Sequence, residues 1–156
     1  MTSATEFATG DRTVAPATSG QLATFRLDGD LYGVEVEHVQ EVLRSQQLTR
    51  VPLAPSAVAG LINLRGQVVT AIELRERLGR PPRPAGTDAV VIVVRLDGEA
   101  VSLLVDSIAD VVDVDAADFE APPDTLEGQA RDLIRGAYKL DGQLLLALDV
   151  HKAVSA

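Results

Sequence analysis

The sequence of 156 residues contains no cysteine. This absence excludes thiol catalysis, disulfide bonds and cysteine metal sites, and it fits a reducing compartment. Aromatic residues are also scarce, at 3%, although hydrophobic residues make up 46% of the chain. The core must therefore be built from valine, leucine, isoleucine and alanine. A chain of this length can bury enough surface to fold without a disulfide or a metal.

Basic residues are outnumbered, with 14 lysines and arginines against 23 aspartates and glutamates, for a formal net charge of −9. A nucleic-acid-binding protein normally needs a basic face that replaces phosphate counterions and aromatic side chains that stack on bases. A small oligonucleotide-binding barrel, which would bind single strands in a salt-sensitive way, is therefore disfavoured. Binding to anionic lipid surfaces is disfavoured for the same electrostatic reason.

Long hydrophobic runs are missing as well. The apolar segments 89–94 and 144–148 are far too short to span a bilayer and are typical of strands. The N-terminus has no basic segment followed by an apolar one, so it does not resemble a secretory signal. Residues 1–20 are rich in alanine, threonine and serine without any period, which predicts a flexible tail. We expect a soluble, cytoplasmic protein.

The residue patterns of catalysis and metal binding are absent too. The two histidines, His38 and His151, fall in predicted short helices without neighbours suited to a metal or a catalytic relay. No glycine loop for phosphate and no nucleophile elbow occurs. The densest acidic group lacks the glycine and terminal glutamate of a calcium loop, which favours a solvated acidic face; it comprises Asp110, Asp113, Asp115 and Asp118. We expect no enzyme, no metal and no cofactor.

What the sequence does contain is an internal repeat. Arg26-Leu27-Asp28-Gly29 recurs as Arg95-Leu96-Asp97-Gly98, 69 positions later. Residues 60–69 are echoed by residues 136–145, 76 positions later and in the same order. The pattern indicates one small β unit in two copies, about 21–80 and 88–156, joined by the proline-rich segment 80–86. A cleft between two such copies is a common binding site.

Alternating apolar residues predict strands, and Asp-Gly or Arg-Gly pairs predict the turns between them. The expected strands cover residues 23–27, 31–36, 61–64, 67–72, 89–96 and 99–105, with a last hairpin around Asp141-Gly142. Apolar residues at i, i+3 and i+4 predict a short helix at 37–43 and a counterpart at 106–112. Further short helices are expected at 73–78 and 149–154, and a helical turn at 56–59. Many short strands with glycine turns indicate small β-barrels.

The motif Gly60-x-x-Asn63-Leu64-Arg65-Gly66 stands out. As structure, Gly60 would end the helical turn and Gly66 would form the hairpin turn, and neither role requires Arg65. The second copy has Asp141 at the corresponding position. An arginine at a hairpin tip can make a bidentate bond to a carboxylate on a partner or on a neighbouring element. We therefore expect a specific role for Arg65.

This motif, followed by Gln67-Val68-Val69, resembles the G-x-x-N-L-R-G signature of the CheW family, the bacterial chemotaxis coupling proteins. Residues 32–42 are similar to the first hairpin and helix of that family, and residues 90–93 and 105–111 to its second half. The likeness covers about residues 21–154. The resemblance implies a mainly β fold of two SH3-like five-stranded barrels side by side, with a few short helices, in a CheW-like domain at 21–156. Whether the copies exchange strands stays open.

The resemblance also implies a non-enzymatic adaptor. It would join the cytoplasmic tips of methyl-accepting chemoreceptors to the regulatory domain of the histidine kinase CheA, and it would be recruited to membrane receptor arrays through these partners. No phosphotransfer, ATP-binding or receiver segment accompanies the domain. The alternative is a tandem β-barrel scaffold module of another two-component or chemosensory-like pathway.

Two sets of contact residues carry over by position. The receptor-binding groove would include Val39, Glu41, Gly60, Asn63, Arg65, Val90, Val91, Val101 and Ser102. The kinase contact would include Glu120, Pro122, Pro123, Asp124 and Thr125. Family members often carry a large apolar residue near Thr125, and this chain does not.

Overall fold

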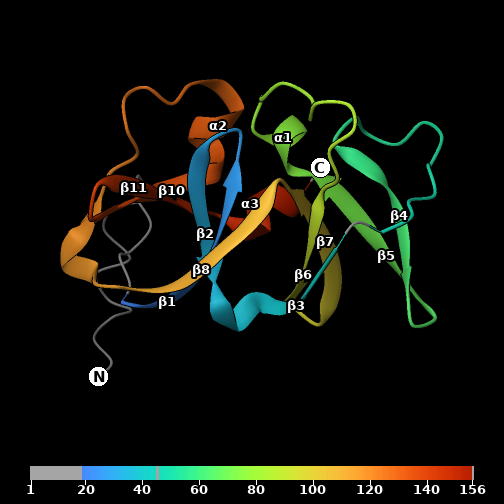
Figure 1. Ribbon diagram of the computed structural model, residues 1–156, viewed down its shortest axis with the longest axis horizontal. Helices are drawn as coiled ribbons and strands as arrows, with labels where there is room; N and C mark the ends of the chain where they lie inside the picture. The colour runs from blue at the N-terminus through green and yellow to red at the C-terminus, as the bar shows by residue number, and fades with distance from the viewer. Residues whose placement is uncertain (1–18, 45, 156) are drawn as a thin grey trace.

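The computed structural model describes residues 19–44 and 46–155, so the tail expected at 1–20 lies almost entirely outside the described residues. These residues form two β-sheets side by side (Figure 1). Sheet A has the order β8 (Ser107–Val114), β1 (Gly20–Leu27), β2 (Asp30–Glu35), β11 (Gln143–Leu148), β10 (Ile134–Leu140) and β9 (Phe119–Glu120). Sheet B has the order β3 (Val39–Leu43), β6 (Val90–Leu96), β7 (Glu99–Val105), β5 (Gln67–Glu73) and β4 (Val58–Leu64).

The described residues also form five short helices, four between strands and one after the last strand. They are η3 (Val36–His38), α1 (Leu74–Arg77), η4 (Ala116–Asp118), α2 (Gly128–Leu133) and α3 (Val150–Val154). The longest of the described helices has six residues, and none is long and apolar enough to cross a membrane. The expected mainly β class with a few short helices is therefore confirmed.

The two copies exchange strands, which settles the point that the sequence left open. Sheet A combines β1 and β2 of the first copy with β8, β10 and β11 of the second. Sheet B combines β6 and β7 of the second copy with β3, β4 and β5 of the first. Apart from the added β9, the two sheets have the same strand order when corresponding strands are matched. Each sheet is thus built from both halves of the sequence.

Neither sheet closes through strand pairing in the described part of the chain, so two closed five-stranded barrels are not seen. Sheet B is nevertheless strongly bent. The tip of its β4–β5 hairpin reaches the opposite edge strand β3, where Arg65 bonds Glu41.

Two expected helices are wrong. Residues 37–43 form the end of η3 and then β3, which pairs with β6, and residues 107–114 form β8, which pairs with β1. The helix prediction required Val42 to be buried beside Val39 and Leu43, but Val42 is 42% exposed. Valine also favours strands because its branched side chain packs well on a pleated surface. The expected helical turn at 56–59 is a plain turn that leads into β4, and Gly60 lies inside that strand.

Three apolar clusters hold the sheets together. One lies inside the bend of sheet A, one inside the bend of sheet B, and the largest is shared between the two sheets. Strand β6 shows how: Ile92 and Val94 belong to the shared cluster, whereas Val91 and Val93 belong to the interior of sheet B. Central strands are therefore buried on both faces, and the sheets form one packed body.

Candidate functional site

Arg65 occupies a backbone conformation that does not suit arginine. Three hairpin turns place a non-glycine residue at φ of +52°, directly before a glycine: Asp28, Arg65 and Asp97. Aspartate tolerates the left-handed region because its short side chain can bond the local backbone, whereas a long side chain gains no such bond. Asp141, at the corresponding position of the last hairpin, does not adopt a positive φ. The backbone therefore does not explain the arginine at this tip.

The side chain of Arg65 forms an ion pair across sheet B. Its Nη2 donates to Oε2 of Glu41 on strand β3. The Arg65 side chain remains 70% exposed and that of Glu41 is 21% exposed. An exposed pair of this kind contributes at most about 1 kcal/mol to stability. Since Arg has five N–H donors, most of its hydrogen-bonding capacity remains directed at the surface.

Two other residues of the motif shape the hairpin. The Oδ1 of Asn63 accepts a hydrogen bond from the backbone N–H of Gly66 at 3.0 Å, which fixes the turn. Gly60 is buried at φ of +154°, and a Cβ there would lie 2.6 Å from the carbonyl oxygen of Thr49. Thr49 needs this approach because it exchanges backbone hydrogen bonds with Leu61. Asn63 therefore fixes the turn that presents Arg65, whereas Gly60 lets the segment of Thr49 approach the far end of the same hairpin.

The valines named with this site do not form an exposed groove. Val39, Val90 and Val101 are half-buried against the shared cluster. Val39 and Val101 flank Val94 from either side, since both pair with it across the sheet. Val91 is 1% exposed, inside sheet B. Residues 90–94 alternate between the two clusters, as successive side chains of a strand point to opposite faces.

Ser102, also named with this site, is fully buried. It pairs across the sheet with Val93 and Ala71, which both belong to the interior cluster of sheet B. Its Oγ has no hydrogen-bond partner among the described residues. Ser102 and Val91 can therefore influence a partner only through the packing of sheet B.

The second expected contact lies at the other end of the molecule, in the segment that includes β9 and the loop after it (Figure 1). Glu120 forms an exposed ion pair with Lys139 at 3.1 Å, and Asp124 is exposed. Pro122 and Pro123 are half-buried. Phe119 packs edge to face on Tyr138 with ring centroids 5.1 Å apart, which anchors the segment to sheet A.

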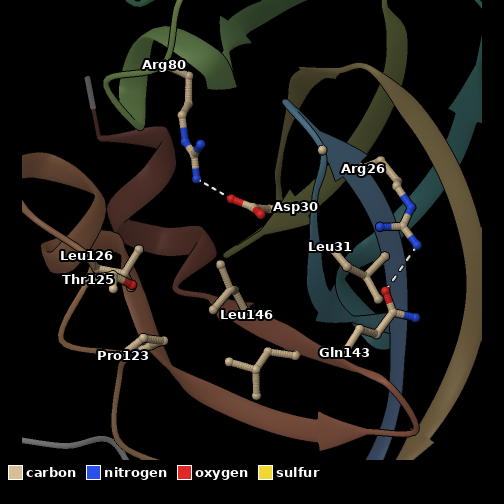
Figure 2. Close-up of a pocket in the computed structure, with 11 residues that line it drawn as sticks. Arg26, Asp30, Leu31, Arg80, Pro123, Thr125, Leu126, Gln143 and Leu146 are labelled. Atoms are coloured by element: carbon tan, nitrogen blue, oxygen red, sulfur yellow. Dashed lines mark hydrogen bonds and ion pairs between the residues drawn. The ribbon is translucent and has the colours of Figure 1, made fainter.

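Pro123 and Thr125 line a cleft of about 490 Å³ (Figure 2). Its other walls come from the β1–β2 hairpin, strand β11 and the segment after α1. Figure 2 shows Leu126 and Leu146 on one side and the ion pair of Arg80 with Asp30 on the other. Sequence reasoning did not find Arg80, which also donates to the Tyr32 hydroxyl at 3.1 Å.

The comparison with known proteins decides the family. Residues 21–156 match the CheW-like domain family. The chain belongs to this family. The CheW of Treponema pallidum is 29% identical over 140 residues, which cover 87% of this chain and 82% of that protein. The CheW of Klebsiella aerogenes is 29% identical over 144 residues, covering 92% and 87%.

A solved structure agrees with these relatives. The scaffolding protein TtCheW from Thermoanaerobacter tengcongensis superposes with a TM-score of 0.78 at 28% identity, covering 89% of this chain and 94% of that one. The resemblance noted at residues 60–66 is therefore confirmed, and the chain is a member of a chemotaxis scaffold family.

This CheW-like domain also contains a charge network that the sequence did not reveal. Arg75 of α1 is only 7% exposed, and it donates to both carboxylate oxygens of Asp106. Arg83 donates to Asp106 at 3.1 Å and to both oxygens of Glu73 at 2.9 and 3.2 Å. Burial raises the pKa of the Asp106 carboxyl, but the hydrogen bonds from Arg75 and the Asp28 backbone, and the charge of Arg83, outweigh burial and lower the pKa to about 2.

The two histidines of this CheW-like domain meet, although they are far apart in the sequence. The rings of His38 and His151 pack edge to face with centroids 5.8 Å apart. Each Nε2 lies 3.9 Å from a carboxylate, of Glu35 and Asp97 respectively. No group of three or more potential ligands is placed to hold a metal within residues 19–44 and 46–155.

Proposed function

We propose that this protein is a non-enzymatic adaptor that couples the cytoplasmic tips of chemoreceptors to the histidine kinase CheA. Membership of the chemotaxis scaffold family gives the setting. The observation that carries the proposal is Arg65, held at the tip of a hairpin against its backbone preference and 70% exposed. A residue kept there at a cost to the turn is best explained by contact with a partner.

The receptor would bind across the edge of sheet B. A receptor tip is a helical hairpin, and an apolar strip with charges at its rim suits a docked amphipathic helix. The half-exposed parts of Val39 and Val101, on either side of Val94, would supply a narrow apolar strip rather than a groove. Glu41 orients the guanidinium of Arg65, whose remaining donors can bind a carboxylate of the receptor. Asn63 would act through the shape of the turn, Gly60 through the position of the Thr49 segment, and Val90, Val91 and Ser102 through packing.

The kinase would bind at the other end, on Glu120, Pro122, Pro123, Asp124 and Thr125. The cleft of about 490 Å³ beside Pro123 and Thr125 can accept an apolar side chain. A kinase regulatory domain built as a pair of SH3-like barrels would pack against this end of sheet A. Two separate contacts on one small body would hold receptor and kinase at high effective concentration. The adaptor would then be cytoplasmic and recruited to receptor arrays.

The experiment is a calorimetric titration of the full chain with a CheA regulatory domain, followed by titration of the mixture with a receptor tip fragment. Binding of both at separate sites is the expected result. Arg65→Glu should weaken receptor binding about tenfold, since a charge-assisted bond is lost. It should leave kinase binding unchanged. Lys152→Glu, with the same charge reversal on α3, is the matched control.

A charge swap distinguishes a receptor-binding role of Arg65 from a purely structural role in its ion pair with Glu41. The double variant Glu41→Arg with Arg65→Glu can re-form the ion pair across sheet B but presents the opposite charge at the tip. If Arg65 contacts the receptor, the swap folds normally and still fails to bind it. Restored receptor binding would assign Arg65 a purely structural role. Kinase binding without any receptor binding in the unmodified protein would favour the tandem scaffold of another pathway.

A further inference from the structure

The loop between β3 and β4 presents a leucine to water in a strained conformation. Leu53 is 103% exposed and has a φ of +65°. A leucine rarely adopts positive φ, because its Cβ crowds the backbone and no local hydrogen bond compensates. Its side chain gains nothing from the fold in return. A residue that costs stability in this way points to a role outside the fold.

The loop is held in place. Thr49 exchanges backbone hydrogen bonds with Leu61 at 2.9 and 2.8 Å, which fixes the start of the loop to β4. Pro52 and Pro55 restrict the backbone on either side of Leu53. Leu48 and Val51, 36% and 38% exposed, extend the apolar surface beside it. We name the surface of Arg44, Leu48, Arg50, Val51 and Leu53 the loop patch.

The loop patch is positively charged on a negatively charged protein. No aspartate or glutamate occurs from residue 42 to residue 72, although the chain carries 23 of them and a net charge of −9. Arg44 and Arg50 are exposed. Among the described residues, no carboxylate lies within ion-pair distance of either guanidinium. Arg65, the third arginine of the stretch, is paired with Glu41.

A hollow of about 490 Å³ adjoins the patch. Leu48, Arg50, Val58 and Ala89 contribute to its walls. Two acidic residues, Asp88 and Glu73, line it as well, and Glu73 is paired with Arg83. The hollow has room for a side chain inserted beside Leu53. The patch therefore combines an apolar anchor, a hollow and unpaired cationic groups.

The position of the loop in the fold supports a docking role, a step that rests on the kinase contact proposed above for residues 120–125. The bridge of Thr49 with Leu61 in sheet B corresponds to the pair of Glu120 with Ala137 in sheet A, since Leu61 and Ala137 are 76 positions apart. The loop after Thr49 thus occupies the place that the loop after Glu120 occupies in the other sheet. In Figure 1 the two loops stand on opposite sides of the molecule, and the tip of the β4–β5 hairpin lies at the other end of sheet B.

We propose that the loop patch is a third docking surface, which binds an acidic segment of a partner protein through Leu53, Arg44 and Arg50. Opposite charge on the segment would pair with the arginines, and an apolar residue of the segment would pack on Leu53 and into the hollow. A second copy of this chain is a poorer occupant, because two bodies of net charge −9 repel one another. The surface is separate from the Arg65 tip and from residues 120–125.

The test is fluorescence anisotropy with the full chain and two labelled peptides, one of Glu-Glu-Leu-Leu repeats and one of Lys-Lys-Leu-Leu repeats. The net charge alone predicts binding of the lysine peptide only. The loop patch predicts salt-sensitive binding of the glutamate peptide as well. Arg44→Glu with Arg50→Glu should weaken that binding about tenfold. Lys152→Glu, on α3, should leave it unchanged.

Leu53→Asn separates binding from folding. Asparagine accepts positive φ more readily than leucine, so this variant should keep or raise the melting temperature. It should nevertheless weaken binding of the glutamate peptide about fivefold, because the apolar anchor is lost. Weaker binding in a more stable protein is not expected of a purely structural residue.

Three results would overturn the proposal. The first is binding of the glutamate peptide that is absent or insensitive to Arg44, Arg50 and Leu53. The second is concentration-dependent self-association in sedimentation that Arg44→Glu with Arg50→Glu abolishes, since the occupant would then be a second copy. The third is binding to phosphatidylglycerol vesicles, but not to the peptide, through the same arginines.

Discussion

Arg75 and Asp106 form a two-point ion pair at the place where the chain passes from sheet B to sheet A. Nε of Arg75 lies 2.9 Å from Oδ1 of Asp106, and Nη2 lies 2.6 Å from Oδ2. Asp106 is the single residue between β7 and β8. It also accepts a hydrogen bond from the backbone N–H of Asp28, at the β1–β2 turn of sheet A, at 2.8 Å. The pair therefore ties α1, the crossing point and the β1–β2 turn together.

Breaking this pair should cost far more stability than breaking an exposed one. Arg75→Met leaves the Asp106 carboxylate without its main partner in a partly buried place, and we expect a loss of about 2–4 kcal/mol in the free energy of unfolding. Lys139→Met, which removes the exposed ion pair with Glu120, is the control and should cost less than about 1 kcal/mol. Urea denaturation followed by circular dichroism measures both. Equal losses for the two variants would contradict the assigned role.

The same pair should make stability depend on pH in the acid range. The pKa of Asp106 is about 2 in the folded protein and near 3.8 in the absence of its partners. A carboxyl whose pKa is lowered by folding stabilises the protein above its unfolded pKa, and that stabilisation is lost as the pH falls through the folded pKa. The contribution is on the order of 2 kcal/mol, present above about pH 4 and lost towards pH 2.

Asp106→Asn isolates this effect, because asparagine does not titrate. The difference in unfolding free energy between the original protein and Asp106→Asn should be largest near pH 5 and should shrink towards pH 2. Urea denaturation at a series of pH values measures the difference. A difference that stays constant over this range would show that Asp106 does not carry the acid sensitivity.

Two buried hydroxyl groups should respond in opposite ways to removal. Thr24 Oγ1 donates to the backbone carbonyl of Asp110, which links β1 to β8, whereas Ser102 Oγ has no partner among the described residues. Thr24→Val should cost about 1–2 kcal/mol, because the Asp110 carbonyl loses its donor. Ser102→Ala should be neutral or stabilise by up to about 1 kcal/mol, because an unsatisfied polar group leaves the core. Thermal denaturation of both variants measures these changes in stability. A clear loss of stability in Ser102→Ala would show that the Ser102 hydroxyl has a hydrogen-bond partner.

The sequence predicted the local features well and the long-range ones poorly. The hairpin turns and the strand alternation depend on neighbours in the chain, and the structure confirms them. Strands β3 and β8 were missed because valines at i, i+3 and i+4 fit a helix as well as a strand when the partner strand is unknown. The network of Arg75, Arg83 and Asp106 joins segments 31 and 23 positions apart. No sequence pattern brings such segments together.

In the candidate site, too, the sequence predicted local features and not long-range contacts. A specific role for Arg65 was predicted from its position at a turn that does not require arginine. Its partner Glu41 could not be paired with it, since the contact depends on the bend of sheet B. Val91 and Ser102 were assigned to the site only by their position in the family resemblance. Their burial depends on which face of a doubly buried strand they occupy, and the sequence does not show this. Leu53 was missed because an exposed leucine has no signature in the sequence.

Two glycines 76 positions apart should be irreplaceable for the same reason. A Cβ on Gly60 would lie 2.6 Å from the Thr49 carbonyl oxygen, and one on Gly136 would lie 2.5 Å from that of Glu120. A Cβ on Gly136 would also overlap Cζ of the Phe119 ring. Because each position faces a backbone oxygen that cannot rotate away, alanine at either one should displace the neighbouring segment and destabilise the fold by more than about 3 kcal/mol. Gly142→Ala is the control, since nothing lies within 4 Å and only its φ of +82° opposes alanine. It should cost about 1–2 kcal/mol.

Strand exchange follows from the lengths of two connections. In sheet A, β8 starts beside the last residues of β1. If β8 paired with β6 of its own copy in the same way, it would have to start beside the last residues of β6. Strand β7, however, ends beside Val90, at the start of β6. One residue, Asp106, separates β7 from β8. The two Cα–Cα steps across Asp106 span about 7 Å, whereas the chain would have to cover more than about 13 Å to return from the start of β6 to its end. The connection between β2 and β3 has three residues, and their coiling into η3 shortens the distance that it can span.

Neither half of the sequence should therefore fold alone. Fragment 1–80 would carry two hairpins and strand β3 without β6, and fragment 81–156 would carry two hairpins and strand β8 without β1. Each would expose its side of the shared cluster, so we expect each to show no cooperative thermal unfolding by circular dichroism. An equimolar mixture should regain a cooperative transition, because both sheets can then assemble. Cooperative unfolding of either fragment as a monomer would mean that a copy can close on itself, and that the short connections do not enforce the exchange.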